Sequence, residues 1–303
     1  GISRFKVARL LDSAVAAGLV RIRIGLPGAL DITLSVELQA RFGLRHCVVI
    51  DSHESAPAEM RRVLAGAAAR LLTEIVTPED VLGLAWARSA ADMVGQLRGL
   101  APVPVVQLTG ALSSPDLGDT SIELVREVAH RTGGPAYYFY APLIVPDTAT
   151  SRALRKQPEI ARAFAQVGAV TKAVVGLGAW APGQSTLFDA MGAFEREELV
   201  RLGVIGEICS SFIDREGHAI VSSISERMIG IDAAGLASVP EVIAIPYGDA
   251  KASAVRAAVN GGFVNGLVTH SSLARILLGD DDLGDDDLGD NDLGDNDLGD
   301  HDR

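Results

Sequence analysis

The segment GLAWARSAADM, residues 83–93, joins a predicted strand to a predicted helix and carries polar side chains at the junction. The backbone N–H groups and the dipole of a helix N-terminus favour an anion. Arg88 and Ser89 can add direct hydrogen bonds, and the small residues beside them allow close backbone approach. A plain strand-to-helix turn is the alternative. The residues that we predict to contact a small ligand here are Gly83, Ala85, Trp86, Arg88 and Ser89.

Two further segments follow predicted strands. In QLTGALSS, residues 107–114, the side chains of Gln107, Thr109, Ser113 and Ser114 offer amide and hydroxyl groups to a polyol, with Gly110 between them, although such loops are often simple turns. The segment VVGLGAW contains Gly176 and Gly178 but lacks the third glycine and the acidic residue of a dinucleotide fingerprint. We therefore include Gly178 among the ligand-contacting residues but expect no nicotinamide cofactor.

The segment IPYGDAKASAV provides the best cationic candidate. A strand ends at Gly248, and Lys251 lies in the first turn of the next predicted helix, where it can reach a phosphate or carboxylate. A solvated surface lysine is the alternative. Asp214, in SSFIDREGHAI, can accept hydrogen bonds from sugar hydroxyls or can be an ordinary hairpin residue.

No catalytic motif accompanies these candidates. None of the six histidines has an HExxH, paired-carboxylate or nucleophile-elbow setting. The two cysteines, Cys47 and Cys209, are far apart and lack metal-type spacing. We expect no catalytic residues, no metal and no cofactor.

Helical and strand patterns alternate from about Leu30, which predicts an α/β fold with a doubly wound parallel sheet. Ligands bind at the carboxyl ends of the strands in such sheets. The predicted strands are HCVVID, VLGLAW, VPVVQLTG, AYYFYAPLIV, KAVVGLG, EVIAIPYG and GLVTH. The predicted helices include residues 58–74, 121–131, 151–165 and 251–259.

The first 27 residues predict part of a winged helix-turn-helix. Apolar residues recur at helical spacing after Ser3, and the alternating LVRIRI that follows Gly18 indicates a strand. The first 25 residues carry a net charge of +4, which suits phosphate contacts. A surface helix with an edge strand is the alternative. Two preceding helices of the motif are missing, so we expect a fragment of a longer protein. The predicted DNA-binding residues are Ser3, Arg4, Lys6 and Arg9.

The chain ends in a five-residue repeat of Asp, Leu and Gly. Residues 279–303 carry twelve Asp and one Arg out of a total charge of −12, which leaves −1 for the residues before them. High charge and few apolar groups predict a disordered acidic tail, and its spacing fits no calcium loop. We expect three parts: a head at 1–27, an α/β body at 28–278 and the tail at 279–303.

No signal peptide opens the chain, and no apolar run is long enough to cross a bilayer. We therefore expect a cytoplasmic protein with no membrane partner.

The chain resembles the SorC/DeoR-type sugar-binding transcriptional regulators. The similarity runs from Gly1 to Leu278 and includes GISRFKVARLLDSAVAAGLVRIRI, VVQLTGAL, YAPLIV, VVGLGAW, GEICSSFIDREG and GDAKASAVRAAVNGGFVNGLVT in family order. The resemblance implies a sensing domain related in fold to sugar-phosphate isomerases and deaminases, a dimer or tetramer, and operator DNA as a partner. It also implies a sugar, polyol or sugar-phosphate effector that modulates DNA binding. A sugar-phosphate isomerase or deaminase-like enzyme is the alternative.

By the same resemblance, the loop of Ser89 would contact the phosphate or terminal hydroxyls, Gln107 and Thr109 the sugar, Asp214 a hydroxyl, and Lys251 the phosphate. Three positions depart from the family. Ala85 and Ala87 replace common glycines, which favours an unphosphorylated ligand. Thr109 replaces a lysine that in some members can form a Schiff base, and His270 replaces a typical aspartate.

Overall fold

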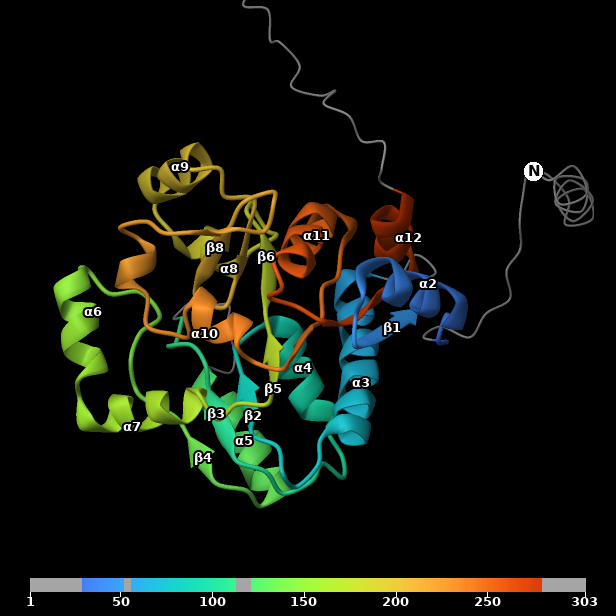
Figure 1. Cartoon of the computed structure of the whole chain (residues 1–303), viewed down its shortest axis with the longest axis horizontal. Helices are drawn as coiled ribbons and strands as arrows, with labels where there is room; N and C mark the ends of the chain where they lie inside the picture. The colour runs from blue at the N-terminus through green and yellow to red at the C-terminus, as the bar shows by residue number, and fades with distance from the viewer. Residues whose placement is uncertain (1–28, 52–55, 113–120, 280–303) are drawn as a thin grey trace, which may run out of the picture.

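The computed structural model describes residues 29–51, 56–112 and 121–279, which form two sheets with covering helices (Figure 1). Within these residues the larger sheet has seven strands, all parallel, in the order β1-β11-β10-β5-β2-β3-β4. The strands are β1 (His46–Ile50), β2 (Leu82–Leu84), β3 (Val105–Gln107), β4 (Ala136–Tyr137), β5 (Lys172–Val175), β10 (Glu241–Ala244) and β11 (Gly266–His270). The doubly wound parallel sheet predicted from the sequence is confirmed.

Helices cover both faces of this sheet, which is why its strands are almost continuously apolar. In β5, Ala173 and Val175 face one apolar core, whereas Val174 faces the other. The first core includes residues of α2 (Ile32–Phe42), α10 (Ala233–Ala237), α11 (Ala252–Asn260) and α12 (Ser271–Gly279). The second includes residues of α3 (Pro57–Ile75), α4 (Arg88–Gln96) and α5 (Ser121–Thr132).

A smaller antiparallel sheet continues directly from β5. Its described strands, in the order β6-β7-β8-β9, are β6 (Leu177–Ala179), β7 (Gly206–Ile208), β8 (Ser211–Ile213) and β9 (Ala219–Ile220). The prediction of a single strand over KAVVGLG is wrong, because the chain leaves the parallel sheet at Gly176. A Cβ atom there would lie 3.0 Å from the Cβ of Ala87, so glycine permits this close approach.

Three other predicted elements differ from the structure. The strand over AYYFYAPLIV stops after Tyr137, and isolated bridges at Pro142 and Ile144 replace the ladder. The helix over 151–165 is two helices, α6 (Thr148–Arg155) and α7 (Pro158–Val167), because proline lacks an N–H donor and disfavours a helical residue before it. The helix over 251–259 begins with a 3-10 turn, η2 (Asp249–Lys251). The remaining helices are α8 (Thr186–Ala190), α9 (Ala193–Arg201) and η1 (Ser225–Arg227).

The predicted head, with Ser3, Arg4, Lys6 and Arg9, lies outside the described residues, as does the acidic tail from residue 280 onward. Both therefore stay predictions. Among the described helices, none is long and apolar enough to cross a membrane.

Candidate functional site

A partly enclosed cavity lies at the carboxyl ends of β2, β3 and β5, where the two sheets meet. The space open to the centres of water-sized molecules is about 100 Å³. Since one water needs roughly 10–15 Å³ by this measure, the cavity has room for several waters or for part of a small polar ligand. Its lining comprises Trp86, Ala87, Arg88, Ser89, Thr109, Gly110, Leu112, Leu143, Gly176, Leu177, Gly178, Gly183, Gln184, Ser185, Thr186, Leu187, Glu207, Cys209, Ile245, Tyr247 and Lys251.

The start of α4 forms one wall. Its N-cap residue, Ala87, has an extended backbone and provides no side-chain cap, so the first N–H groups of the helix have no side-chain acceptor from that residue. Ser89 is 5% exposed and lines the cavity, as does Arg88 from the same turn. A helix N-terminus with a hydroxyl and a guanidinium beside it is a favourable environment for an anion.

Lys251 reaches the same cavity from the other side of the β5–β6 junction. It ends η2, which follows Gly248, whose φ of +92° lies in the region that favours glycine. Its Nζ atom donates a hydrogen bond of 2.9 Å to the carbonyl of Leu177 and lies 5.0 Å from the ring centroid of Tyr247. Burial lowers the pKa of this ammonium group, while the nearby Tyr247 and Glu207 oppose the change.

Glu207 is the acidic group of the cavity. It lies on β7 directly opposite Gly178 of β6, and its Oε1 atom accepts a hydrogen bond of 3.1 Å from the hydroxyl of Ser185. Burial raises the pKa of Glu207 to about 7, although the Ser185 hydrogen bond and the charge of Lys251 act in the opposite direction. A carboxyl group in this state can donate a hydrogen bond when protonated and accept one when ionised.

The structure brings seven of the twelve predicted ligand-contacting residues to this cavity. They are Trp86, Arg88, Ser89, Thr109, Gly110, Gly178 and Lys251. These residues come from four separate predicted loops, and their meeting follows from the adjacency of β10, β5, β2 and β3 in the parallel sheet.

Gln107, Gly83, Ala85 and Gly248 do not line the cavity. Gln107 is fully buried, and its amide donates to the carbonyl of Thr109 and the hydroxyl of Ser121 and accepts from the N–H of Phe139, so its polar atoms are used within the fold. Gly83 lies inside β2, where a Cβ atom would come within 2.9 Å of Val170. Ala85 is 1% exposed and belongs to the apolar core. Gly248 acts through the backbone turn that precedes Lys251.

Asp214 also lies away from the cavity, in the turn between β8 and β9. Its Oδ1 atom accepts from the backbone N–H of His218, which is the ordinary hairpin role considered as the alternative. Among the described residues, Asp214, Glu216 and His218 are the one group with three potential metal ligands close together, but this exposed acidic turn gives no further sign of a metal.

Sequence reasoning missed Glu207, Tyr247 and the segment 183–187. Ser113 and Ser114, which it did include, lie outside the described residues. The one local signal for Glu207 is that it is the single charged residue of the short apolar segment VIGEIC, and the structure pairs this segment with a strand on each side. No local signal pointed to Ser185, since its role depends on the hydrogen bond to Glu207.

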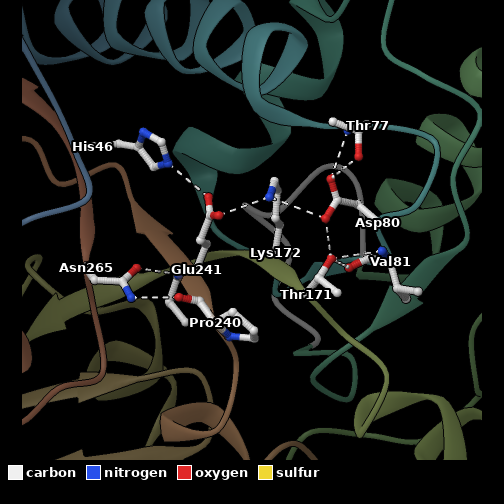
Figure 2. Close-up of polar contacts among 10 residues, drawn as sticks. His46, Thr77, Asp80, Val81, Thr171, Lys172, Pro240, Glu241 and Asn265 are labelled. Carbon is white, nitrogen blue, oxygen red and sulfur yellow. Dashed lines mark hydrogen bonds and ion pairs between the residues drawn. The ribbon is translucent and has the colours of Figure 1, made fainter.

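A second polar cluster lies at the opposite edge of the large sheet, where its strands begin (Figure 2). Lys172, at the start of β5, lies 3.1 Å from Oε1 of Glu241 and 3.3 Å from Oδ1 of Asp80. Glu241 also contacts Nε2 of His46 at 2.9 Å, and Thr171 donates to Asp80 at 2.7 Å. None of these residues lines the cavity described above, and their charged groups bond to one another, so we assign the cluster to stability.

The carboxyl groups of this cluster are held ionised. Burial alone would raise the pKa of Asp80, but hydrogen bonds from Thr77 and Thr171 and the charge of Lys172 outweigh it and lower the pKa. Burial acts in the same direction on Glu241, and contacts with His46 and Lys172 reverse it. The cluster therefore joins the first residues of β1, β5 and β10 and the turn before β2 through ion pairs and hydrogen bonds.

The parallel sheet and the polar cavity at the carboxyl ends of its strands define an α/β domain that can hold a small ligand. A family model described as "Putative sugar-binding domain" matches residues 29–279. The chain belongs to this family of sugar-binding domains.

Similar proteins of known name are transcriptional regulators. The chain is 26% identical to the sorbitol operon regulator of Klebsiella pneumoniae over 286 residues, which are 92% of this chain and 90% of that protein. It is 27% identical to the deoxyribonucleoside regulator of Bacillus subtilis over 283 residues, again 92% and 90% of the two chains.

Solved structures agree with this assignment. The full-length sorbitol operon regulator SorC from Klebsiella pneumoniae has a TM-score of 0.77 and 25% identity, with 92% of this chain and 90% of that chain covered. A DeoR family regulator from Listeria monocytogenes has a TM-score of 0.73 and 25% identity, with 81% and 98% covered. The resemblance to SorC/DeoR-type sugar-binding regulators is confirmed.

Proposed function

We propose that this protein is a transcriptional regulator whose α/β domain binds a phosphorylated sugar, and that the bound sugar changes operator binding by the N-terminal head. The observation that carries the proposal is the meeting of Arg88, Lys251 and the uncapped start of α4 in one cavity. Two cations and a helix N-terminus favour a ligand with a concentrated negative charge, such as a phosphate group. We give this positive environment more weight than the alanine at position 87, which on its own favours an unphosphorylated ligand.

The rest of the cavity suits the sugar itself. Glu207, Thr109 and Ser185 bring a carboxyl and two hydroxyl groups, which can exchange hydrogen bonds with several sugar hydroxyls. Trp86 and Tyr247 add aromatic surface to the lining, as expected of a small-molecule site that combines apolar surface with a few polar groups. We therefore assign the phosphate to the side of Arg88 and Lys251 and the hydroxyls to the side of Glu207.

A ligand alters DNA binding only when it binds one DNA-competence state more tightly than the other. We expect the head residues Ser3, Arg4, Lys6 and Arg9 to contact operator DNA, and we expect the regulator to act in the cytoplasm as a dimer or tetramer. The family assignment supports a sugar-type effector, and the names of the relatives support a role in transcription regulation.

The test is a thermal-shift series on the chain with sorbitol, ribose, ribose 5-phosphate, glucose 6-phosphate and inorganic phosphate. A ligand of the native state raises its stability by mass action, so we expect at least one sugar phosphate to raise Tm more than its unphosphorylated counterpart. The active compound is then added to an operator-binding assay with the full regulator at fixed salt. No stabilisation by any compound would contradict the proposal.

An isomerase or deaminase-like enzyme is the second candidate, because Glu207 is a carboxyl group with a pKa near neutrality in the cavity and can serve as a general base. Asp214 does not line the cavity, so it is not a candidate for this role. Steady turnover of a sugar phosphate or amino-sugar phosphate that Glu207→Gln abolishes would favour the enzyme. Binding without turnover would favour the regulator.

A further inference from the structure

The turn that carries Lys251 is fastened to the start of α12 by two hydrogen bonds. The backbone N–H of Gly248 donates to Nε2 of His270 at 3.0 Å. The hydroxyl of Ser272 donates to Oδ2 of Asp249 at 2.8 Å. These bonds hold Gly248, the residue before η2, and Asp249, its first residue. Because η2 is only three residues long, a displacement of Lys251 acts directly on both bonds.

Lys251 is the cavity residue through which a bound anion can act on this turn. Its Nζ atom donates one of its three N–H groups to the carbonyl of Leu177. A phosphate offers a stronger, charge-assisted hydrogen bond than a neutral carbonyl does, so it draws the ammonium group toward itself. Gly248 has a φ of +92° and no Cβ atom. The backbone before Lys251 can therefore change conformation without the steric clash that a side chain would cause.

The other end of the connection is α2. Helix α12 packs against α2, and the two lie side by side in Figure 1. Leu34 of α2 packs on the core to which Leu273 of α12 belongs. Helix α2 begins at Ile32, only a few residues after the segment 1–27 that carries the basic residues. A series of contacts therefore leads from η2 to α12 and from α12 to α2, the helix that follows the predicted head in the sequence.

We propose that the contacts of His270 and Ser272 with the η2 turn transmit occupation of the cavity at Lys251 to α12 and α2, and thereby to the N-terminal head. His270 and Ser272 are positioning residues that need not touch the ligand. The inference rests on the proposed function, since it concerns the regulation of the same site. Its physical requirement is that the η2 turn has two arrangements, with and without an anion on Lys251.

Hydrogen exchange of the chain, followed by mass spectrometry with and without saturating glucose 6-phosphate or inorganic phosphate, tests the proposal. We expect exchange to change by at least about twofold in residues 248–252, and also in 271–279 and 32–42. Ser272→Ala should keep the change at 248–252 and lose most of it at 32–42. The matched control is Ser238→Ala, which removes an exposed hydroxyl that donates to Gly235 within α10 and should leave both changes intact.

A pair of substitutions at His270 gives a second readout. His270→Gln keeps an acceptor near the Gly248 N–H and should retain the response at 32–42, whereas His270→Leu removes the acceptor and should lose it. An unchanged response at 32–42 in both Ser272→Ala and His270→Leu would overturn the proposal, as would a ligand response confined to 248–252 in the unmodified chain. If exchange at 248–252 does not respond to either anion, the result would contradict the anion site at Lys251 and therefore the proposed function.

Discussion

The hydroxyl of Ser185, the N-cap residue of α8, donates a hydrogen bond to Oε1 of Glu207 on β7. Burial raises the pKa of this carboxyl to about 7 from an ordinary value of 4.5. The folded state therefore holds the proton more tightly than the unfolded chain does. The resulting contribution to stability is complete below about pH 4.5 and is lost as the pH rises through about 7.

Glu207→Gln removes this titration. We expect the substitution to raise the free energy of unfolding relative to the unmodified chain, and the difference should grow as the pH is raised from about 5 to about 8. Urea unfolding at several pH values measures it. Glu216→Gln, in an exposed turn, is the control and should show no such trend. A difference that is constant with pH would contradict the assignment.

Lys251→Met tests the phosphate side of the cavity. Hydrogen bonds to charged groups contribute about 1.5–3 kcal/mol, so we expect affinity for a sugar phosphate to fall by about 10- to 100-fold. Affinity for an unphosphorylated sugar should change little. Titration calorimetry with both ligands gives the comparison, and Lys156→Met, an exposed lysine at the end of α6, is the matched control. Equal losses for both ligands would place the phosphate elsewhere.

Gly178→Ala tests the fit of the carboxyl group against β6. A Cβ atom at this position would lie 2.5 Å from Oε1 of Glu207 and 2.7 Å from the Cβ of Ser185, so one of these side chains must move. We expect a loss of about 1–3 kcal/mol in stability and weaker sugar binding. Gly168→Ala is the control, because a Cβ atom there meets nothing within 4 Å. If Gly178→Ala binds the sugar with unchanged affinity, sugar binding does not depend on the position of the Glu207 carboxyl.

Lys172→Met tests the cluster at the start of the strands. The substitution leaves Asp80 and Glu241 without their shared cation, and removal of one partner from a buried ion pair costs about 3–5 kcal/mol. Because the pKa values of both carboxyls are lowered, their contribution is present above their ordinary pKa and lost as the pH falls below it.

The difference between Lys172→Met and the unmodified chain should therefore shrink as the pH falls from about 5 to about 3. Chemical unfolding at each pH measures the difference, again with Lys156→Met as the control. A loss of stability that is independent of pH would show that packing of the lysine stem, rather than its charge, stabilises this edge.

The sequence predicted the parallel sheet because strands buried on both faces carry an apolar run, such as residues 173–175 of β5. It could not predict the break at Gly176, since the antiparallel sheet that begins there depends on pairing with β7, about 30 residues later. Pro158 was visible as a helix breaker, yet the apolar period on either side of it favoured one helix. Periodicity in the sequence therefore predicts which elements are present, whereas pairing with distant segments determines where each element ends.

The residues of the candidate site also divide into those that local sequence features indicate and those that depend on distant segments. Ser89 and Lys251 were found because each follows a strand and begins a helix, a feature of the local sequence. Glu207 was missed because its place in the cavity depends on the hydrogen bond from Ser185 and the pairing with Gly178, which come from other segments. Gln107 was included on its chemical type, but its amide completes the hydrogen bonds of Phe139 and Ser121 inside the fold. Side-chain type identifies a candidate, whereas direction within the strand decides its role.

One residue, Gly176, separates the last position of the parallel sheet from the first of the antiparallel sheet, and it lies in the wall of the cavity. The chain thus passes from one sheet to the other through a single residue, while both sheets share one apolar core with α11. The two residues after Gly176 then meet the two charged groups of the cavity: the carbonyl of Leu177 accepts from Lys251, and Gly178 faces Glu207. A side chain at position 176 would therefore disturb the path of the chain and the placement of both charges at once.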